Sequence, residues 1–544
     1  MIQLDQLWGV TRGTHRPRKL GALTVAMLSA CAVADTPADI DDTDDLVEHG
    51  GTVVESVAVE RAEPAAPGDA GIGDPLFPTL GNGGYDVEHY DLDLRYETAE
   101  PSRPIHGTVR ILARATRPLS QLNLDFSGAS VAAVCIDGRP AAFHSDGEDL
   151  VIKPRQAIRR GERFVITVTD FVAIPNLPTA SDVLGAPLVI TADGTAWGAQ
   201  PNGAHQIFPS NDHPGDMASF SFRIDVPAGT TAVANGVQTS QRTAHGRSVY
   251  RFEQRAPMAT ELAQVAVGAF TVISRGRHAG VIVRDVVPTR LAADLGPKLA
   301  AVTAQLDWLE QRVGDYPFPT YGSLVVDAPL GFALETQTLS LYETGFFTRE
   351  PAFFESIMVH ELAHQWFGDS VAPARWADVW QNEGHATWYE LTSQLDPDSA
   401  DFASTMQRVY SLGDIWRTLL GPVASPLSGD LNGLFNPNVY YGGALTLFAL
   451  RQRIGDPAFR QLERAWVTRY RGRSASTADF IALASQISGQ DQTAFLNDWL
   501  YGATTPVMPG HADWAAEPVD PGLAAAGRTA GTAVPLKGLR VIRH

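Results

Sequence analysis

The chain is short of basic residues. Over 544 residues, Lys and Arg number 42 against 61 Asp and Glu, which gives a formal net charge of −19 at pH 7. A surface of this charge repels phosphate backbones, so the composition argues against nucleic acid as a partner. The apolar fraction of 44% is ordinary for a soluble globular protein. A chain of this length exceeds what one hydrophobic core supports, so we expect roughly two to four domains.

The apolar run near the start of the chain is too short to cross a membrane as a stable helix. It covers residues 20–30 and follows Arg16, Arg18 and Lys19. A charged segment followed by a short apolar one is typical of a secretory signal. We therefore expect the protein to be exported.

The end of that run resembles the bacterial lipobox. Leu28-Ser29-Ala30-Cys31 matches the pattern in which the cysteine becomes the lipidated first residue of the mature protein. We expect a lipoprotein that contacts the membrane only through this N-terminal anchor. Ordinary signal cleavage before Asp35 is the alternative, and it would give a periplasmic or secreted protein.

Cysteine is nearly absent, with two in the whole chain. If Cys31 carries a lipid, Cys135 has no partner, so we expect no internal disulfide even in an oxidising compartment. Cys135 lies in the apolar stretch 131–136. A cysteine in such a stretch is expected to act as a small buried hydrophobic residue.

Composition and periodicity divide the chain into six segments. Residues 32–80 are rich in Ala, Asp, Glu, Pro and Gly, which indicates a disordered acidic linker. Alternating apolar residues, as in 85–94 and 220–226, predict half-buried strands, and the period becomes helical from Leu299. The expected segments are a signal peptide with lipobox (1–31), the linker (32–80), an all-β domain (81–275), a mainly helical catalytic domain (276–455), a short helical region (456–505) and a disordered tail (506–544).

Two histidines four positions apart indicate a metal site. His360 and His364 lie in a helical pattern, where four residues advance about one turn, so both imidazoles reach the same ion. Glu361 points roughly 100° away from His360. It does not share their direction, but it reaches a water on the open side of the metal, which is the place of a general base.

Catalytic zinc normally takes three protein ligands and keeps one position for water. Glu383 is the expected third ligand, because it lies in a second helical stretch, with eighteen residues between it and His364. That gap is long enough for a turn through Pro373 and an antiparallel helix that brings the carboxylate back to the ion. The spacing therefore predicts one Zn²⁺ per chain, held by two histidines and one glutamate.

The two motifs together resemble the gluzincin aminopeptidases, which include aminopeptidase N and the leukotriene hydrolase. His360-Glu361-Leu362-Ala363-His364-Gln365-Trp366-Phe367-Gly368 and Asn382-Glu383-Gly384 carry the resemblance, which covers about residues 81–505. It implies a multidomain α+β protein with an N-terminal all-β saddle domain, a thermolysin-like, mainly helical catalytic domain and a short C-terminal helical cap.

The resemblance also implies a substrate site. Phe332-Ala333-Leu334-Glu335-Thr336 stands where the family has Gly-x-Met-Glu-Asn, a strand whose glutamate binds the free amino group of the substrate and whose edge pairs with the peptide. Glu335, with Phe332 and Ala333 beside it, is therefore expected to bind substrate. Tyr440 aligns with the tyrosine that stabilises the oxyanion, and Tyr441 is the second candidate.

One element departs from the family pattern. The family has a Gln-x-Glu element in the saddle domain whose last residue, Glu or in the leukotriene hydrolase Gln, helps to hold the amine. Gln200-Pro201-Asn202 fills that place here. Gln200 and Asn202 are expected at the substrate, but Asn202 has no charge, so Glu335 is left as the single predicted anchor for the ammonium group.

These residues together predict a zinc aminopeptidase acting on peptides. Water activated by the metal attacks the carbonyl, Glu361 moves the proton, Tyr440 stabilises the oxyanion and Glu335 restricts cleavage to the first peptide bond. Three alternatives are a zinc endopeptidase, an epoxide hydrolase on the same scaffold, and a catalytically silent zinc-stabilised surface binding module. An intact Glu361 argues against the last, because a binding protein does not need a base beside an open zinc position.

Overall fold

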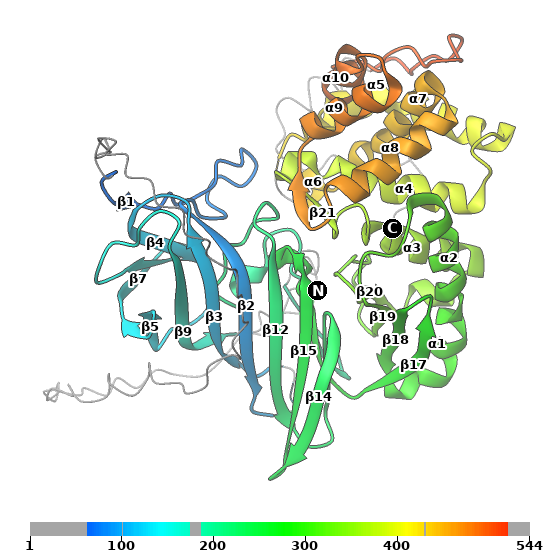
Figure 1. The fold of residues 1–544 in the computed structure, drawn as a ribbon. Helices are drawn as coiled ribbons and strands as arrows, with labels where there is room; N and C mark the ends of the chain where they lie inside the picture. The colour runs from blue at the N-terminus through cyan, green and yellow to red at the C-terminus, as the bar shows by residue number, and fades with distance from the viewer. Residues whose placement is uncertain (1–62, 99, 101, 175–186, 429–430, 520–544) are drawn as a thin grey trace, which may run out of the picture. The chain divides into compact units, whose positions relative to one another are not determined.

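The computed structural model describes residues 63–98, 100, 102–174, 187–428 and 431–519 (Figure 1). The predicted signal peptide and lipobox at 1–31, the linker up to residue 62 and the tail from 520 lie outside the described residues. Within the described part, no helix has the length and apolar character needed to cross a membrane.

The N-terminal part is built on an eight-stranded sheet. In β2 (Tyr85–Tyr96), alternate side chains such as Tyr90, Leu92 and Leu94 are fully buried, which confirms the half-buried strand expected there. β2 pairs in parallel with β12, and the other neighbours in the sheet are antiparallel. The strand order is β14 (Val237–Ala244), β15 (Arg247–Met258), β12 (Ala218–Pro227), β2, β3 (Ile105–Ala115), β9 (Arg163–Ala173), β5 (Ala133–Ile136) and β6 (Arg139–Pro140).

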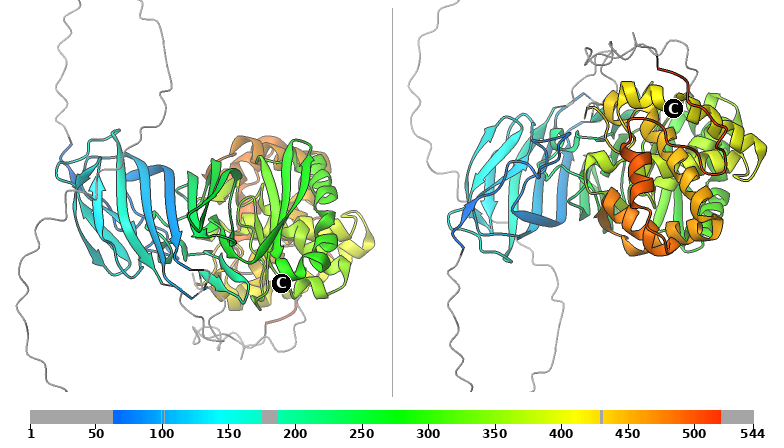
Figure 2. Two further views of the ribbon diagram at one scale, coloured as in Figure 1. Left: turned by 90° about the horizontal axis from the view of Figure 1, so that it is seen from below. Right: turned by 90° about the horizontal axis from the view of Figure 1, so that it is seen from above.

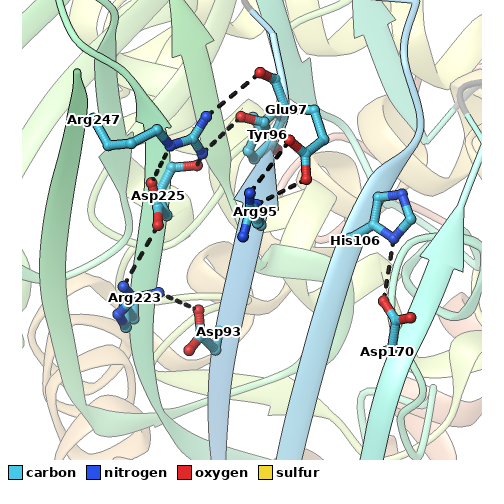
Figure 3. Close-up of polar contacts among 9 residues, drawn as sticks. All are labelled: Asp93, Arg95, Tyr96, Glu97, His106, Asp170, Arg223, Asp225 and Arg247. Atoms are coloured by element: carbon cyan, nitrogen blue, oxygen red, sulfur yellow. Dashed lines mark hydrogen bonds and ion pairs between the residues drawn. The ribbon is translucent and has the colours of Figure 1, made fainter. Parts of the chain in front are cut away.

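The partly exposed face of this sheet carries ion pairs rather than apolar groups (Figure 3). Asp225 accepts from Arg247 at 2.7 Å and lies 3.6 Å from Arg223, which also reaches Asp93 at 2.6 Å. Pairs that remain in contact with water contribute little, about 0–1 kcal/mol each. The stability of the sheet therefore comes from its buried face.

Two four-stranded sheets complete the β-rich part. One has the order β1 (Ala66–Pro67), β4 (Leu119–Asp125), β8 (Asp149–Lys153) and β7 (Ala142–Asp146). The other has the order β10 (Leu188–Ile190), β11 (Gly194–Trp197), β16 (Val265–Gly268) and β13 (Thr231–Ala234). The short 3₁₀ turns η1 (Ala204–Gln206) and η2 (Thr260–Leu262) lie near the ends of β11 and β16.

A fourth sheet belongs to the second part of the chain. Its order is β17 (Phe270–His278), β18 (Val281–Pro288), β19 (Thr320–Val326) and β20 (Ser340–Glu343), with β18, β19 and β20 parallel. β17 begins before residue 275, where we expected the β domain to end. The antiparallel pairing of β17 with β18 moves the boundary to the start of β17.

Helices make up most of the remainder, and the later ones gather together in every view (Figures 1 and 2). In α2 (Val302–Val313), Leu306 and Leu309 face the core and Gly314, with φ of 118°, ends the helix, as the period predicted. The other helices are α1 (Ala292–Lys298), α3 (Pro351–His364), α4 (Trp380–Gln394), α5 (Ala400–Leu420), α6 (Leu431–Leu434), a π-helical turn η7 (Asn438–Gly442), α7 (Gly443–Ile454), α8 (Asp456–Arg469), α9 (Thr477–Ser488) and α10 (Thr493–Tyr501). β21 (Val371–Pro373) pairs with β22 (Arg473–Ala475).

The segments predicted to be disordered are shorter than expected at both ends. Residues 63–80 are folded, and Phe77 and Leu80 are buried in the same core as the helices. Beyond residue 505, Trp514 meets Tyr410 edge-on at 5.6 Å and stacks on Phe448 at 6.3 Å. Few aromatic residues occur in either segment, so composition indicated disorder, but single large side chains are enough to dock each one.

Cys135 is buried in β5, as expected of a small hydrophobic residue. It is, however, disulfide-bonded. The expectation that Cys135 has no partner is therefore not met. Cys31 itself lies outside the described residues.

The segment 63–80 is held by one buried carboxylate. Asp74 accepts hydrogen bonds from the backbone N–H of Trp376 at 2.7 Å and of Leu76 at 2.8 Å, and it lies 3.0 Å from Nε2 of His213. Burial acts to raise the pKa of Asp74, but these hydrogen bonds outweigh it, so the pKa lies below its ordinary value. One side chain thereby joins the N-terminal segment, a loop of the β part and the loop that follows β21.

We predict that Asp74→Asn lowers the free energy of unfolding by about 2–3 kcal/mol at pH 7, because a hydrogen-bonded buried charge is lost. A carboxyl whose pKa is depressed on folding stabilises the protein above its unfolded pKa of about 3.9, and this contribution disappears as pH falls through the folded pKa. The difference between wild type and variant should therefore shrink in acid. Denaturant titrations at several pH values measure it.

Asp69→Asn is the matched control, because Asp69 lies in the same segment but is exposed in its pair with Arg117. Its removal should change the free energy of unfolding by less than about 1 kcal/mol. Equal losses in the two variants would show that Asp74 is not the anchor.

Candidate metal centre and substrate site

The two motif histidines lie on one face of α3. From Ile357 to His364 every residue of this helix is buried, so the helix is surrounded by protein and its polar side chains must be satisfied inside. The rings of His360 and His364 are centred 4.9 Å apart. They are 4% and 1% exposed. The spacing of four residues therefore places both imidazoles at one point, as predicted.

Glu383 reaches the same point from α4. One of its oxygens, Oε2, lies 3.4 Å from Nε2 of His360 and 3.5 Å from Nε2 of His364. One ligand atom from each of the three residues falls within 4.8 Å of the others, and Glu383 is 2% exposed. The structure brings together the three residues that the sequence predicted as ligands.

The outer nitrogens of the two rings show which form each histidine takes. Nδ1 of His364 lies 3.1 Å from the carbonyl oxygen of Phe367, which can only accept, so Nδ1–H donates and Nε2 is the nitrogen left to face Glu383. Nδ1 of His360 lies 3.2 Å from Oε2 of Glu390, and the same argument applies to an ionised carboxylate. Two imidazole Nε2 atoms and one carboxylate oxygen, converging in a buried place, fit a divalent zinc ion, which would take the place of the protons on these nitrogens.

The charges at this point depend strongly on one another. Burial acts to raise the pKa of Glu383, but His364 and His360 outweigh it and hold the pKa at about 2. Burial also acts to lower the pKa of His360, and Glu383 and Glu390 reverse this, to about 9. The pocket therefore stabilises positive charge beside Glu383, which is what a cation requires.

Glu361 lies beside the three ligands and not among them. An oxygen of Glu361 falls within 4.8 Å of ligand atoms of both His364 and Glu335. Burial raises its pKa to about 8, and His360 and His364 oppose the rise while Glu335 and Glu383 add to it. Its Oε2 is buried and has no hydrogen-bond partner. A carboxylate of this kind can take a proton from a water between the ligands and Glu335.

Tyr440 and Tyr441 are adjacent in the π-helical turn η7 but point to different places. The ring of Tyr440 stacks on His360 at 5.9 Å, and its pKa is raised well above the ordinary value by burial and then by the charges of Glu383, Glu335 and Glu361. Tyr441 packs instead against Trp416 at 6.4 Å. The phenol of Tyr440 is therefore the one at the metal ligands, as the resemblance implied.

A contact between two glycines places η7 against α4. A Cβ on Gly384 would lie 3.0 Å from the backbone of Gly443, and a Cβ on Gly443 would lie 2.8 Å from Cα of Gly384. Only residues without side chains allow this approach. Because Gly384 follows Glu383 and Gly443 closely follows Tyr440, the contact sets the distance between the carboxylate and the phenol.

Glu335 is held by two glutamines. The side-chain amide of Gln365 donates to the carbonyl of Glu335 at 2.9 Å and accepts from the N–H of Thr338 at 2.8 Å. The amide of Gln200 donates to Oε1 of Glu335 at 2.6 Å. Gln365 directly follows His364 in the chain, so the segment that carries Glu335 is tied to the helix that carries the metal ligands.

The other predicted substrate residues lie around this segment. Leu334 forms a bridge with Leu341 through two backbone hydrogen bonds, which holds the segment as a short strand. Phe332 and Ala333 are half-buried. Asn202 is also half-buried, and none of the hydrogen bonds found among the described residues joins it to Glu335.

Three acidic residues near the site were not predicted. Glu390 follows Glu383 by seven residues, two turns of the same helix, so a search for carboxylates at this spacing would have found it. Asp369 is fully buried with neither oxygen hydrogen-bonded, and burial raises its pKa well above the ordinary value, with Glu335 adding to the rise. Glu261 lies beside Gln200, and no periodicity in the sequence marks it.

Two family models match the chain. Residues 298–499 match the model described as the peptidase family M1 domain, and residues 195–262 match the peptidase M1 N-terminal domain. The first range holds the predicted ligands, Glu335 and Tyr440, and the second holds Gln200 and Asn202.

Known proteins of similar sequence are M1 enzymes. The chain is 25% identical over 324 residues to aminopeptidase M1 from Arabidopsis thaliana, which covers 57% of this chain and 37% of the plant protein. It is 22% identical over 453 residues to leukotriene A-4 hydrolase from Xenopus laevis, covering 78% and 72%. The chain therefore spans little more than a third of the plant aminopeptidase.

One solved structure matches a larger share of this chain than the plant aminopeptidase does. The chain is 30% identical to an M1 zinc metallopeptidase from Deinococcus radiodurans, crystallised as a mutant bound to a Tyr-Ser-Ala substrate. The TM-score is 0.71, and the match covers 81% of this chain and 99% of that chain.

We predict that Glu390→Leu loosens zinc binding by about 10- to 100-fold, because His360 loses the acceptor that orients its ring. Glu390→Gln keeps an acceptor oxygen in nearly the same place and should retain most of the affinity. Titration of the metal-free protein with zinc against a competing chelator measures both. Equal losses in the two variants would mean that the charge of Glu390 matters and not its acceptor.

Proposed function

The chain belongs to peptidase family M1, and we propose that it is a zinc-dependent aminopeptidase that removes N-terminal residues from peptides. One zinc per chain would be held by His360, His364 and Glu383. The observation that carries the proposal is the position of Glu335. Its carboxylate lies within 4.8 Å of the ligand atoms of Glu361 and His364, so a group bound to Glu335 is next to the reacting carbonyl.

Each residue has a separate task in this chemistry. When bound, zinc supplies Lewis acidity, which lowers the pKa of a water toward about 7 and polarises a carbonyl. Glu361 accepts the proton of the attacking water and passes it to the leaving amine. Tyr440 donates a hydrogen bond to the oxyanion. A phenol whose pKa is raised stays protonated and so remains a donor at neutral pH.

Glu335 determines which bond is cleaved. The carboxylate of Glu335 accepts from Gln200, its backbone carbonyl accepts from Gln365, and it is buried beside the predicted ligands, so it favours a free ammonium group at that place. Only the first peptide bond of a bound substrate then lies at the metal, so the product is a single amino acid. The related enzyme from Deinococcus radiodurans was crystallised with a tripeptide, which supports peptides as the substrate class.

The test compares a free peptide arylamide with its N-acetylated twin. We predict that wild type cleaves the free substrate far better and that Glu335→Gln lowers kcat/KM on it by roughly 10- to 100-fold, the range expected for one hydrogen bond to a charged group. The acetylated substrate should be affected much less by the variant. A wild-type ratio near one would contradict the aminopeptidase and leave a zinc endopeptidase.

We predict that Tyr440→Phe lowers kcat by roughly 100-fold or more with little change in KM, because the lost hydrogen bond forms mainly in the transition state. Tyr441→Phe is the matched control, since it removes the same atom one residue away. Steady-state kinetics on the free arylamide measure both. A defect confined to the control would assign the role to Tyr441.

We also propose that the protein is exported and that Cys31 becomes its lipidated first residue. The basic and apolar order of residues 16–30 supports export. A disulfide at Cys135 is consistent with export as well, because such bonds persist in oxidising compartments. With two cysteines in the chain, a lipid on Cys31 excludes a bond between the two cysteines, so the disulfide at Cys135 supports export but opposes the lipid anchor.

Mass spectrometry of the mature N-terminus, without reduction, distinguishes these states. We predict a diacylglyceryl group on Cys31 and release of the protein into the soluble fraction in Cys31→Ala, because the anchor is lost. A free amino terminus at Asp35, or Cys31 joined to Cys135, would contradict the anchor.

A further inference from the structure

A buried carboxyl that the proposed mechanism does not use lies beside the substrate site. Glu261 is the middle residue of the turn η2, between β15 and β16, and it is 2% exposed. The same turn is fixed by Thr260, whose hydroxyl donates to Asp212 at 2.8 Å. Its backbone is therefore held in place and its side chain is directed into the protein.

Strand pairing explains why Glu261 meets the substrate site. β11 and β16 are antiparallel, with Ala196 opposite Ala266. Gln200 follows the end of β11 by three residues and Glu261 precedes the start of β16 by four, so both lie beyond the same end of this strand pair. The side-chain amide of Gln200 donates to Oε1 of Glu335 at 2.6 Å, and Gln200 also lies close enough to the carboxyl of Glu261 to lower its pKa. One amide group thus lies between two carboxyls.

The two carboxyls are close enough to repel each other. Burial raises the pKa of Glu261 well above its ordinary value, and the largest charge that adds to the rise is that of Glu335, with a smaller contribution from Glu383. Oε2 of Glu261 is buried and has no hydrogen-bond partner. The salt bridges found among the described residues join no Arg or Lys to either glutamate. A cation placed between them would satisfy the free oxygen and remove the repulsion.

We propose that Glu261 is the second carboxylate of the amine site, so that the free ammonium group of the substrate is held between Glu261 and Glu335. The inference rests on the proposed aminopeptidase function. It replaces the expectation that Glu335 is the only charged anchor. Asn202 has no charge, and Glu261 in the turn η2 supplies the second negative charge instead. The pairing of β11 with β16 brings Glu261 to the same ammonium group.

An ammonium ion suits this place better than a second metal ion. It carries three hydrogens, and the free Oε2 of Glu261 and the oxygens of Glu335 are acceptors on two sides of it. The metal-binding group that includes Glu335 is formed with Glu361 and His364 and does not include Glu261. The ligand class assigned to Glu261 is therefore the α-ammonium group of a peptide or amino acid.

The test uses Glu261→Gln, which keeps the shape and removes the charge. On a free arylamide we expect KM to rise about 10- to 100-fold with a smaller change in kcat, because the lost contact is already made in the ground state. The inhibition constant of L-tryptophan should rise by the same factor, and that of N-acetyl-L-tryptophan should not change. Zinc content should stay at one per chain.

Two controls separate this role from a structural one. Glu463→Gln neutralises another fully buried acid, one that interacts with Tyr389 away from the metal ligands, and should leave the ratio of free to acetylated substrate unchanged. Glu261→Asp keeps the charge and should retain most of the preference for free amines. If Glu261→Gln does not fold, the ratio of free to acetylated substrate can still be measured in Glu261→Asp.

The outcomes are distinct. A high wild-type ratio that Glu261→Gln and Glu261→Asp both leave unchanged overturns the role of Glu261 and leaves the aminopeptidase intact. A wild-type ratio near one overturns the proposed function itself. A second zinc per chain that disappears in Glu261→Gln overturns the ammonium in favour of a metal.

Discussion

Two imidazoles and one carboxylate can bind a single ion only if their helices hold them close together inside the protein. Each of these polar groups would otherwise be more stable in water. Here α3 is buried from Ile357 to His364, so His360 and His364 have almost no contact with solvent, and their outer nitrogens are held by Glu390 and by the carbonyl of Phe367. The glycine contact between α4 and α7 brings Tyr440 to the same point. Burial of polar groups is costly, and this arrangement satisfies them by directing each toward a shared cation.

The cost of burying polar groups also applies to the other acidic residues of the site. Glu335, Glu361, Glu261 and Asp369 are all buried within electrostatic reach of one another, with few cationic side chains to balance them. Such a cluster is stable when cations enter it, one as a metal and another as part of the substrate. Gln200 orients the carboxylate of Glu335 without neutralising it, and Gln365 holds the backbone of the same residue. Affinity for positively charged groups is therefore a property of these four acidic residues together.

Much of this could be predicted from the sequence, because helical periodicity acts over a few residues. The four-residue spacing of His360 and His364 predicted a shared ion, and both the expected strand from Tyr85 and the end of α2 at Gly314 agree with the structure. Glu261 could not be predicted. Its position beside Gln200 depends on the pairing of two strands about seventy residues apart, and no local pattern records that pairing. Residues 63–80 were missed for a related reason, since their order depends on partners far away in the chain, such as His213 and Trp376.

The carboxylate of Asp74 has a consequence for how the protein can mature. In the proposed exported form, the chain would meet proteases that cut N-terminal segments, and residues 32–62 are rich in Asp, Glu, Ala and Pro. Removal of N-terminal residues leaves the stability of the protein unchanged only up to the first residue that contacts the folded domain. Because Asp74 accepts the backbone N–H of Trp376 and faces His213, a cut beyond it would leave those buried groups without a partner. The shortest stable mature form should therefore begin upstream of Asp74, whatever length of leader precedes it.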